Sequence, residues 1–128
     1  MLLRAERMTG VHPDLKRVME LAAERTPWPI GVIEGVRSPE RQKSLIAQGA
    51  SHTMRSRHIP SPNDNLAKAV DVGPAPQNSI TFAWPLYDKL AVIVKATAAE
   101  LNVPIEWGGD WTSFRDGPHW QLPWEQYP

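Results

Sequence analysis

Cysteine is absent from this chain of 128 residues. Without it there is no disulfide scaffold, no thiolate nucleophile, no iron–sulfur cluster and no cysteine-ligated zinc. Any bound metal ion must therefore be held by histidine and carboxylate side chains. The histidines of the chain are His12, His52, His58 and His119.

Net charge is also lacking, because 14 Lys and Arg residues are balanced by 14 Asp and Glu residues. A protein that binds nucleic acid through a broad basic field needs clustered Lys and Arg, so we expect no nucleic-acid partner. The longest apolar stretches are too short to span a bilayer, and residues 1–10 contain no apolar segment of a secretory signal. We therefore expect a protein that is made in the cytoplasm and does not insert stably into a membrane.

One domain is expected, because no repeat or Gly/Ser linker divides the chain and its length suits one hydrophobic core. The spacing of apolar residues and the turn residues between them predict helices over 14–24, 39–48 and 85–101 and strands over 30–36, 69–72, 105–107 and 119–122. The polar, proline-containing stretch 50–68 is expected to be a long loop. Helices and strands that do not alternate in βαβ units indicate an α+β fold.

A metal site is one reading of three polar residues. Asp71 lies between two valines in a predicted strand, where a buried carboxylate needs a compensating partner. His119 follows Asp116 across a Gly-Pro turn, which places an imidazole and a carboxylate beside the same small volume. With His58 there are two histidines, and two histidines and one aspartate are the composition of a catalytic zinc site that keeps one position open.

Catalysis at such a site needs two further groups. A carboxylate that does not bind the metal takes a proton from the attacking water and passes it to the leaving amine. A cation aimed at the developing oxyanion is also needed, and Arg37 at the end of a predicted strand is the candidate.

A competing reading needs no metal. It treats His58 and Asp116 as loop residues, His119 as a hydrogen-bonded strand histidine and Asp71 as a hydrogen-bonded carboxylate. His12, just before the first helix, is expected to cap that helix or face solvent. His52 lies in the polar loop and stays an alternative first ligand.

Five segments occur in an order that closely resembles one peptidase family: GVRSPERQ (35–42), SRH (56–58), AVD (69–71), WGGDW (107–111) and DGPHW (116–120). The chain is similar to the zinc D-Ala-D-Ala carboxypeptidase and L-alanyl-D-glutamate endopeptidase family, and within it to the short phage endolysins that cut the stem peptide of peptidoglycan. This resemblance implies a small hedgehog/DD-peptidase-like fold, an antiparallel sheet flanked by helices. It implies that residues 1–128 form one peptidase domain, with a core over about 11–122 and no separate cell-wall-binding module.

The resemblance also implies a zinc ligand set. The family's S-x-H element falls on 56–58, its G-x-A-x-D element on 67–71 and its D/E-x-x-H element on 116–119. The implied ligands of one catalytic Zn²⁺ are His58, Asp71 and His119, and Asp116 becomes the catalytic acid/base.

Further residues receive supporting roles from the same resemblance. Arg37 would contact the substrate carbonyl or carboxylate, with Gln42 one helical turn further on, and Ser56 would support the first ligand. Trp107 and Trp120 would either wall the pocket or belong to the core, and the core is favoured.

Two departures from the family pattern affect the loop before the second ligand. Ala67 stands where the family usually has glycine, and 59–66 reads as an insertion. An inserted surface loop costs little closure entropy, so the ligands are still expected to converge. Asp64 and Asn65 would form either a second ion site or substrate contact, or an exposed polar loop, and the exposed loop is favoured.

The leading functional hypothesis is an endolysin, a zinc peptidase that hydrolyses the L-Ala–D-Glu amide of stem peptides to lyse the host. It implies a monomer released to the wall through a holin. A second hypothesis keeps the chemistry and changes the bond, to D-Ala-D-Ala carboxypeptidase or dipeptidase action. A third, of another class, is a non-catalytic cell-wall-binding or virion structural protein.

Overall fold

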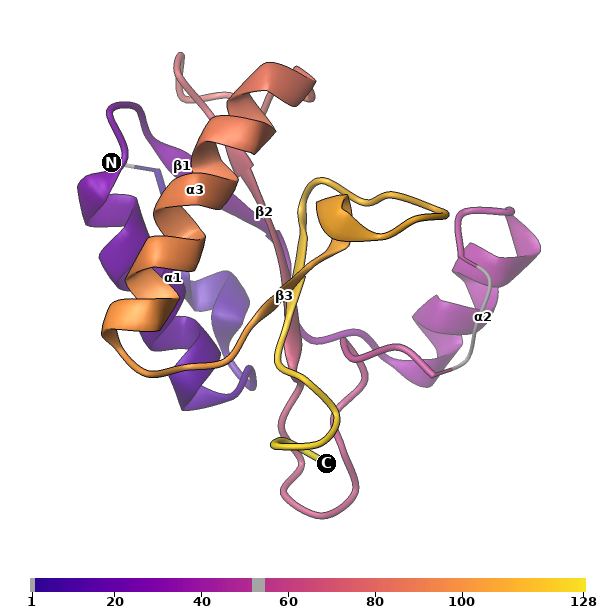
Figure 1. The fold of residues 1–128 in the computed structure, drawn as a ribbon. Helices are drawn as coiled ribbons and strands as arrows, with labels where there is room; N and C mark the ends of the chain where they lie inside the picture. The colour runs from indigo at the N-terminus through magenta and orange to yellow at the C-terminus, as the bar shows by residue number, and fades with distance from the viewer. Residues whose placement is uncertain (1, 52–54) are drawn as a thin grey trace.

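The computed structural model describes residues 2–51 and 55–128 (Figure 1). Within them the elements follow the order η1 (Ala5–Met8), α1 (Pro13–Arg25), β1 (Ile30–Glu34), α2 (Pro39–Ala47), β2 (Ala69–Pro74), α3 (Trp84–Glu100), β3 (Glu106–Trp107), η2 (Gly108–Asp110) and β4 (His119–Gln121). Every expected helix and strand is present, with ends within two residues of the expected ones. The two short 3-10 helices, η1 and η2, were not expected.

The four strands form one antiparallel sheet in the order β1-β2-β4-β3. Strand β2 is central, so its residues have neighbours on both sides. Its Asp71 pairs with His119 of β4 and, next to a bulge in β1, with Glu34. The register therefore brings polar residues from three distant parts of the sequence to one end of the sheet.

Helices α1 and α3 lie side by side against the sheet, whereas α2 lies apart from both, across the strands (Figure 1). The facing sides of α1 and α3 are apolar and enter one hydrophobic core with β1 and β2. The residues these helices bury are Leu15, Val18, Met19, Ala22, Ala23, Tyr87, Leu90, Ala91, Val94, Thr97 and Ala98. An antiparallel sheet flanked by helices confirms the expected α+β class.

Two helices begin where the sequence supplies a cap. His12 Nδ1 accepts a hydrogen bond of 3.1 Å from the backbone N–H of Asp14 at the start of α1, so His12 has the capping role expected of it. Ser38 Oγ accepts from the N–H of Arg41 at 3.0 Å, and Pro39 is the first residue of α2. The Ser38 cap fixes where the chain turns from β1 into α2.

The polar loop is anchored by a buried lysine. Among its described residues, 55–68 contain no helix or strand. The ammonium of Lys68, 1% exposed, donates to Asp64 Oδ1 at 2.6 Å and to the carbonyl of Leu66 at 2.9 Å. Asp64 is thus committed to an ion pair, which agrees with the favoured reading of this segment as a polar loop.

A buried arginine ties the loop to the C-terminal segment. The guanidinium of Arg57 donates to the carbonyls of Leu122 and Tyr127 and lies 4.0 Å from the ring centroid of Trp124. Arg57 immediately precedes His58, so these contacts fix the backbone on which that histidine is carried.

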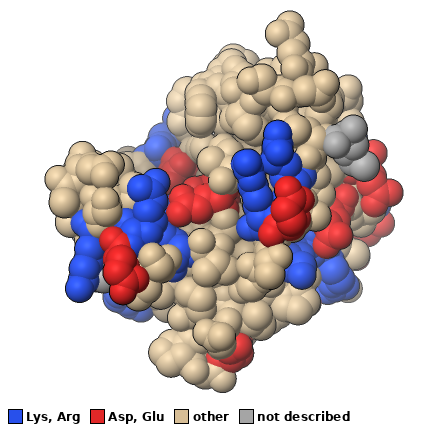
Figure 2. All heavy atoms as spheres, turned by 180° about the vertical axis from the view of Figure 1, so that it is seen from behind, with Lys and Arg blue, Asp and Glu red and all other residues tan. Residues whose placement is uncertain are grey.

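The surface shows no field of one sign on the face turned away from the viewer in Figure 1. Figure 2 shows Lys and Arg beside Asp and Glu on that face, in keeping with the balanced charge of the sequence. Over the described ranges, no helix combines the length and the apolar character needed to cross a bilayer.

Candidate functional site

Three side chains meet where β2 pairs with β4. The nearest ligand atoms of His58, Asp71 and His119 all lie within 4.8 Å of one another. Asp71 Oδ1 lies 3.2 Å from His58 Nε2 and 3.3 Å from His119 Nδ1, and the two imidazoles meet edge to face at a centroid distance of 5.1 Å. The arrangement has the size and donor types of a site for a single metal ion.

The hydrogen bonds behind the two imidazoles decide which ring nitrogen faces the centre of the site. His58 Nδ1 lies 2.7 Å from the carbonyl of Gly35, and His119 Nε2 lies 2.7 Å from Gln121 Oε1. Both oxygens accept hydrogen bonds, so these two nitrogens carry the protons and the opposite nitrogens keep their lone pairs. Metal-binding histidines need this arrangement, because the outer hydrogen bond fixes the tautomer and the ring orientation. The residues therefore fit a zinc ion with two imidazoles and one carboxylate.

Gln121 is itself oriented by a neighbour. Its Nε2 donates to Glu106 Oε1 at 2.9 Å, so its amide oxygen is the end that faces His119. Neither Gln121 nor Glu106 was expected at the site from the sequence. They meet because Glu106 of β3 pairs with Gln121 of β4, and that register is a property of the folded sheet.

The charges of the cluster favour an ionised carboxylate. Burial by itself would raise the pKa of Asp71, but the facing imidazoles of His58 and His119 outweigh it and hold that pKa well below its usual range. Burial would likewise lower the pKa of His119, whereas contact with Asp71 raises it. Asp71 is thus in the deprotonated form that metal ligation requires.

Asp116 is the acid beside this cluster. Burial, and next the negative charge of Asp71, raise the pKa of Asp116. A carboxyl whose pKa is raised exchanges a proton more readily near neutral pH, as a general acid/base must. A backbone contact positions it: the N–H of Asp116 donates to the carbonyl of Gly108 at 3.1 Å. A Cβ at Gly108 would lie 2.4 Å from the Asp116 carbonyl oxygen, so only glycine fits there.

Arg37 is held in a fixed position beside Asp71. Its Nε and Nη2 donate to the two carboxylate oxygens of Glu34 at 2.8 and 2.9 Å, and its Nη1 donates to Gln42 Oε1 at 2.9 Å. Arg37 Nη2 also lies 3.9 Å from Asp71 Oδ2. Gln42 is fully buried and donates in turn to Ser51 Oγ at 2.7 Å. Glu34 was missed by the sequence analysis, although it is the only acid in its strand.

These residues line one cavity of about 430 Å³. Its walls include Glu34, Arg37, Ser56, His58, Asp71, Trp111, Phe114, Asp116 and His119. Ser56 Oγ accepts a hydrogen bond of 3.2 Å from the N–H of His58, so it braces the turn before that residue. Trp107 and Trp120 do not line the cavity: their rings stack 5.7 Å apart in the core, the favoured of the two roles expected for them. The aromatic wall comes instead from Trp111 and Phe114.

A family model of phage L-alanyl-D-glutamate peptidases matches residues 3–121. The chain belongs to this family.

Two relatives of this peptidase family member come from phages. The L-alanyl-D-glutamate peptidase of Listeria phage A118 is 32% identical over 96 residues, which cover 75% of this chain. The chain spans only 31% of that relative's length. The L-alanyl-D-glutamate peptidase of Escherichia phage T5 is 25% identical over 117 residues, covering 87% of this chain and 80% of the relative.

Two solved structures share the fold of this L-alanyl-D-glutamate peptidase family member. The L-Ala D-Glu endopeptidase ChiX of Serratia marcescens has a TM-score of 0.86 and 41% identity, covering 96% of this chain and 88% of ChiX. The vancomycin-resistance D,D-dipeptidase VanXYg has a TM-score of 0.51 and 17% identity, covering 88% and 50%. At that identity the second likeness concerns the fold alone, and it confirms the expected DD-peptidase-like architecture.

The structure thus brings together the residues that the sequence motifs singled out in this family member. His58, Asp71, His119, Asp116 and Arg37 all line one cavity. The alternative first ligand, His52, lies outside the described residues.

Proposed function

We propose that this chain is a zinc-dependent peptidase that hydrolyses the amide between L-Ala and D-Glu in the stem peptides of peptidoglycan. The observation that carries the proposal is the convergence of a metal-binding triad and a separate acid in one cavity. Membership of the phage L-alanyl-D-glutamate peptidase family supports the choice of bond, as does the likeness to the Serratia endopeptidase.

His58, Asp71 and His119 would hold the zinc ion. When bound, zinc polarises the scissile carbonyl and makes the attacking water more acidic. Asp116 accepts the proton of that water and then delivers it to the nitrogen of the leaving D-Glu. The two roles need a carboxyl that does not ligate the metal, and Asp116 stands outside the triad on the wall of the same cavity.

Arg37 supplies positive charge to the developing oxyanion in this proposal. Its guanidinium needs no reorganisation during the reaction, because Glu34 and Gln42 fix its plane through three hydrogen bonds. Fixed donors stabilise a transition state more effectively than mobile ones.

The wider setting belongs to the same proposal. Residues 1–128 form one catalytic domain that works as a monomer, is made in the host cytoplasm and reaches the wall after a holin permeabilises the membrane. The balanced charge agrees with recognition of a short peptide in a local cavity rather than attraction by the whole molecule.

Mass spectrometry of digested peptidoglycan tests the proposed bond. The purified protein is incubated with peptidoglycan with and without a chelator, and new termini are identified. We expect free L-Ala carboxyl and D-Glu amino ends that disappear with the chelator and return with zinc. Release of terminal D-Ala instead would overturn the proposal in favour of a D,D-peptidase. Wall binding without any new ends would favour a non-catalytic protein.

Matched variants test the residue roles. Asp116→Asn is expected to bind zinc normally and lose activity, whereas Asp110→Asn, an exposed acid paired with Lys95, is expected to keep both. His58→Ala is expected to lose zinc, whereas His12→Ala, which removes a helix cap and an edge-to-face contact with Tyr127, is expected to keep the ion. Full activity in Asp116→Asn, or normal zinc binding in His58→Ala, would contradict the assigned roles.

A further inference from the structure

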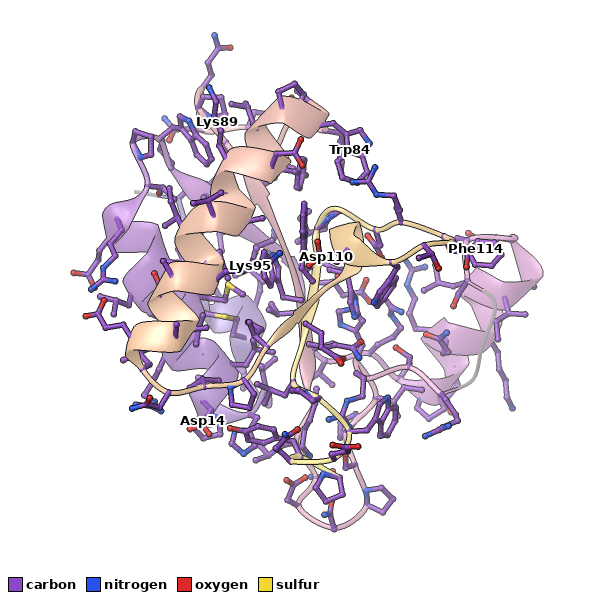
Figure 3. All side chains as sticks on the ribbon, viewed as in Figure 1. Asp14, Trp84, Lys89, Lys95, Asp110 and Phe114 are labelled. Atoms are coloured by element: carbon purple, nitrogen blue, oxygen red, sulfur yellow. The ribbon has the colours of Figure 1, made fainter. Side chains whose placement is uncertain are left out.

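A second cavity adjoins the catalytic one. Its volume is about 300 Å³, and Asp116 lines both cavities. The other lining residues are Phe82, Trp84, Tyr87, Arg115, Gly117 and Pro118. Figure 3 places Trp84 at the start of α3, and Phe114, from the catalytic cavity, at the tip of the loop that follows β3, near α2. Asp116 is the residue that the two cavities share.

The second cavity is an aromatic platform open to solvent. The rings of Phe82 and Tyr87 stack at 6.4 Å with 16° between their planes, and Trp84 lies 6.3 Å from Tyr87. Phe82 is 69% exposed and Trp84 39%, whereas Tyr87, at 3%, is buried beneath them. The guanidinium of Arg115 lies 4.3 Å from the ring centroid of Trp84. Clustered exposed aromatic rings are a costly surface to leave in water, and they mark binding sites more often than scattered single residues do.

The platform is continuous with the catalytic site. A Cβ at Gly117 would lie 3.3 Å from the Trp84 ring and 3.4 Å from Tyr87 Cδ1, so the aromatic rings lie against the backbone one residue from Asp116. The carbonyl of Gly117 accepts a hydrogen bond of 2.7 Å from Trp107 Nε1, which fixes this backbone. A substrate group close to the reacting amide can thus reach the platform.

The chemistry of the substrate differs on the two sides of the amide. On the D-Glu side, carboxylates follow. On the L-Ala side, the amino group is acylated by the lactyl group of N-acetylmuramic acid, so a sugar begins about 7 Å from the amide. Besides the oxyanion-binding Arg37, the catalytic cavity contains Arg55 and Ser51, which suit the carboxylate side. The second cavity is mostly aromatic with one cation, which suits the apolar face of a sugar ring and its hydrogen-bonding substituents.

We infer that the cavity formed by Phe82, Trp84 and Tyr87 binds the N-acetylmuramic acid residue of the glycan strand while the L-Ala–D-Glu amide lies beside Asp116. This inference rests on the proposed function and adds a saccharide subsite to it. The enzyme then binds the sugar and the peptide at the same time, and prefers stem peptides that are still attached to glycan.

Two substrates that differ only in the sugar test the inference. One is N-acetyl-L-Ala-γ-D-Glu-L-Lys and the other carries N-acetylmuramic acid in place of the acetyl group. We expect the wild-type kcat/KM to be about tenfold higher for the sugar-bearing substrate, the size of one good aromatic contact. Phe82→Ala and Trp84→Ala are each expected to bring this ratio toward one, mainly through KM.

Matched controls separate the subsite from general effects. Phe114 is 70% exposed, like Phe82, but lines the catalytic cavity, so Phe114→Ala is expected to change both substrates in proportion and keep the wild-type ratio. Val92→Ala, on the exposed side of α3, is expected to change neither. A wild-type ratio near one, or equal ratios in Phe82→Ala and Phe114→Ala, would overturn the subsite while leaving the peptidase activity intact.

A binding measurement decides the question without turnover. The indole N–H resonance of Trp84 is identified by its loss in Trp84→Phe, and N-acetylmuramyl-L-alanine is titrated into the wild-type protein. We expect this resonance to shift, and N-acetyl-L-alanine to leave it in place. No shift would overturn the subsite. A shift caused instead by γ-D-Glu-L-Lys would place the other side of the substrate there. Failure to cut either substrate would overturn the proposed function alone.

Discussion

Removing the amide oxygen of Gln121 is expected to weaken zinc binding although Gln121 never touches the ion. Its Oε1 accepts the hydrogen bond from His119 Nε2 at 2.7 Å. Gln121→Met keeps the length and approximate volume of the side chain and removes the acceptor. His119 then loses the contact that selects its tautomer and ring orientation.

The expected loss is about 10- to 100-fold in zinc affinity, the usual effect of removing such an outer partner. That range corresponds to about 1.4 to 2.7 kcal/mol of binding free energy. Because the imidazole N–H of His119 stays buried without an acceptor, the metal-free protein should also lose about 1 to 3 kcal/mol of stability.

Competition against a chromophoric chelator measures the zinc affinity, and urea unfolding of the metal-free protein measures the stability. Gln48→Met is the matched control, because Gln48 is exposed at the end of α2 and its side-chain amide donates to Ser44 Oγ, away from the cavity. A zinc affinity in Gln121→Met within threefold of the wild type would refute the argument that this hydrogen bond orients the ligand.

Three further outcomes are expected. Gly108→Ala should lower the activity at least tenfold and the free energy of unfolding by about 1 to 3 kcal/mol, since its Cβ would meet the backbone of Asp116, the proposed catalytic acid. Gly49→Ala, with nothing within 4 Å of its Cβ but a positive φ of 76°, should lose some stability and keep full activity; equal activities of the two variants would contradict this. Tyr127→Phe removes a 2.7 Å hydrogen bond to Asp14 Oδ2. That bond lowers the pKa of Asp14, so its contribution of about 0.5 to 1.5 kcal/mol to the free energy of unfolding should be present at pH 7 and vanish as pH falls through the lowered pKa. Urea unfolding of the wild type and the variant, at pH 7 and at a pH below that pKa, checks that the difference between them disappears in acid. Glu34→Gln should lower kcat about tenfold at unchanged zinc affinity, because Arg37 is then held less firmly beside the reacting carbonyl. An unchanged kcat would argue against the role of Glu34 in positioning Arg37.

Local signals in the sequence predicted most of the fold. Both ends of α2 are set by residues next to it in the sequence. It begins at Pro39, after the capping Ser38, and Gly49, with a positive φ of 76°, follows its end. The 3-10 helices were missed because three or four residues carry too little periodicity to be detected.

The outer parts of the site could not be predicted in the same way. Gln121 meets Glu106, and Glu34 comes to lie opposite Asp71, through strand pairing, and pairing register depends on contacts between segments far apart in sequence. The aromatic wall at Trp111 and Phe114 lies on a loop, where no periodic pattern indicates which side chains point inward.

The pairing of Asp71 with His119 makes the proposed metal site depend on correct assembly of the sheet. Strands β2 and β4 are separated by the whole of α3, so two ligands face each other only after the helix has packed and β4 has docked. A slip of one residue would turn His119 to the other face of the sheet and leave an incomplete ligand set. An ion that binds only the correctly registered sheet stabilises it by mass action. Formation of the correct β2–β4 register would in this way also complete the site proposed to carry out hydrolysis.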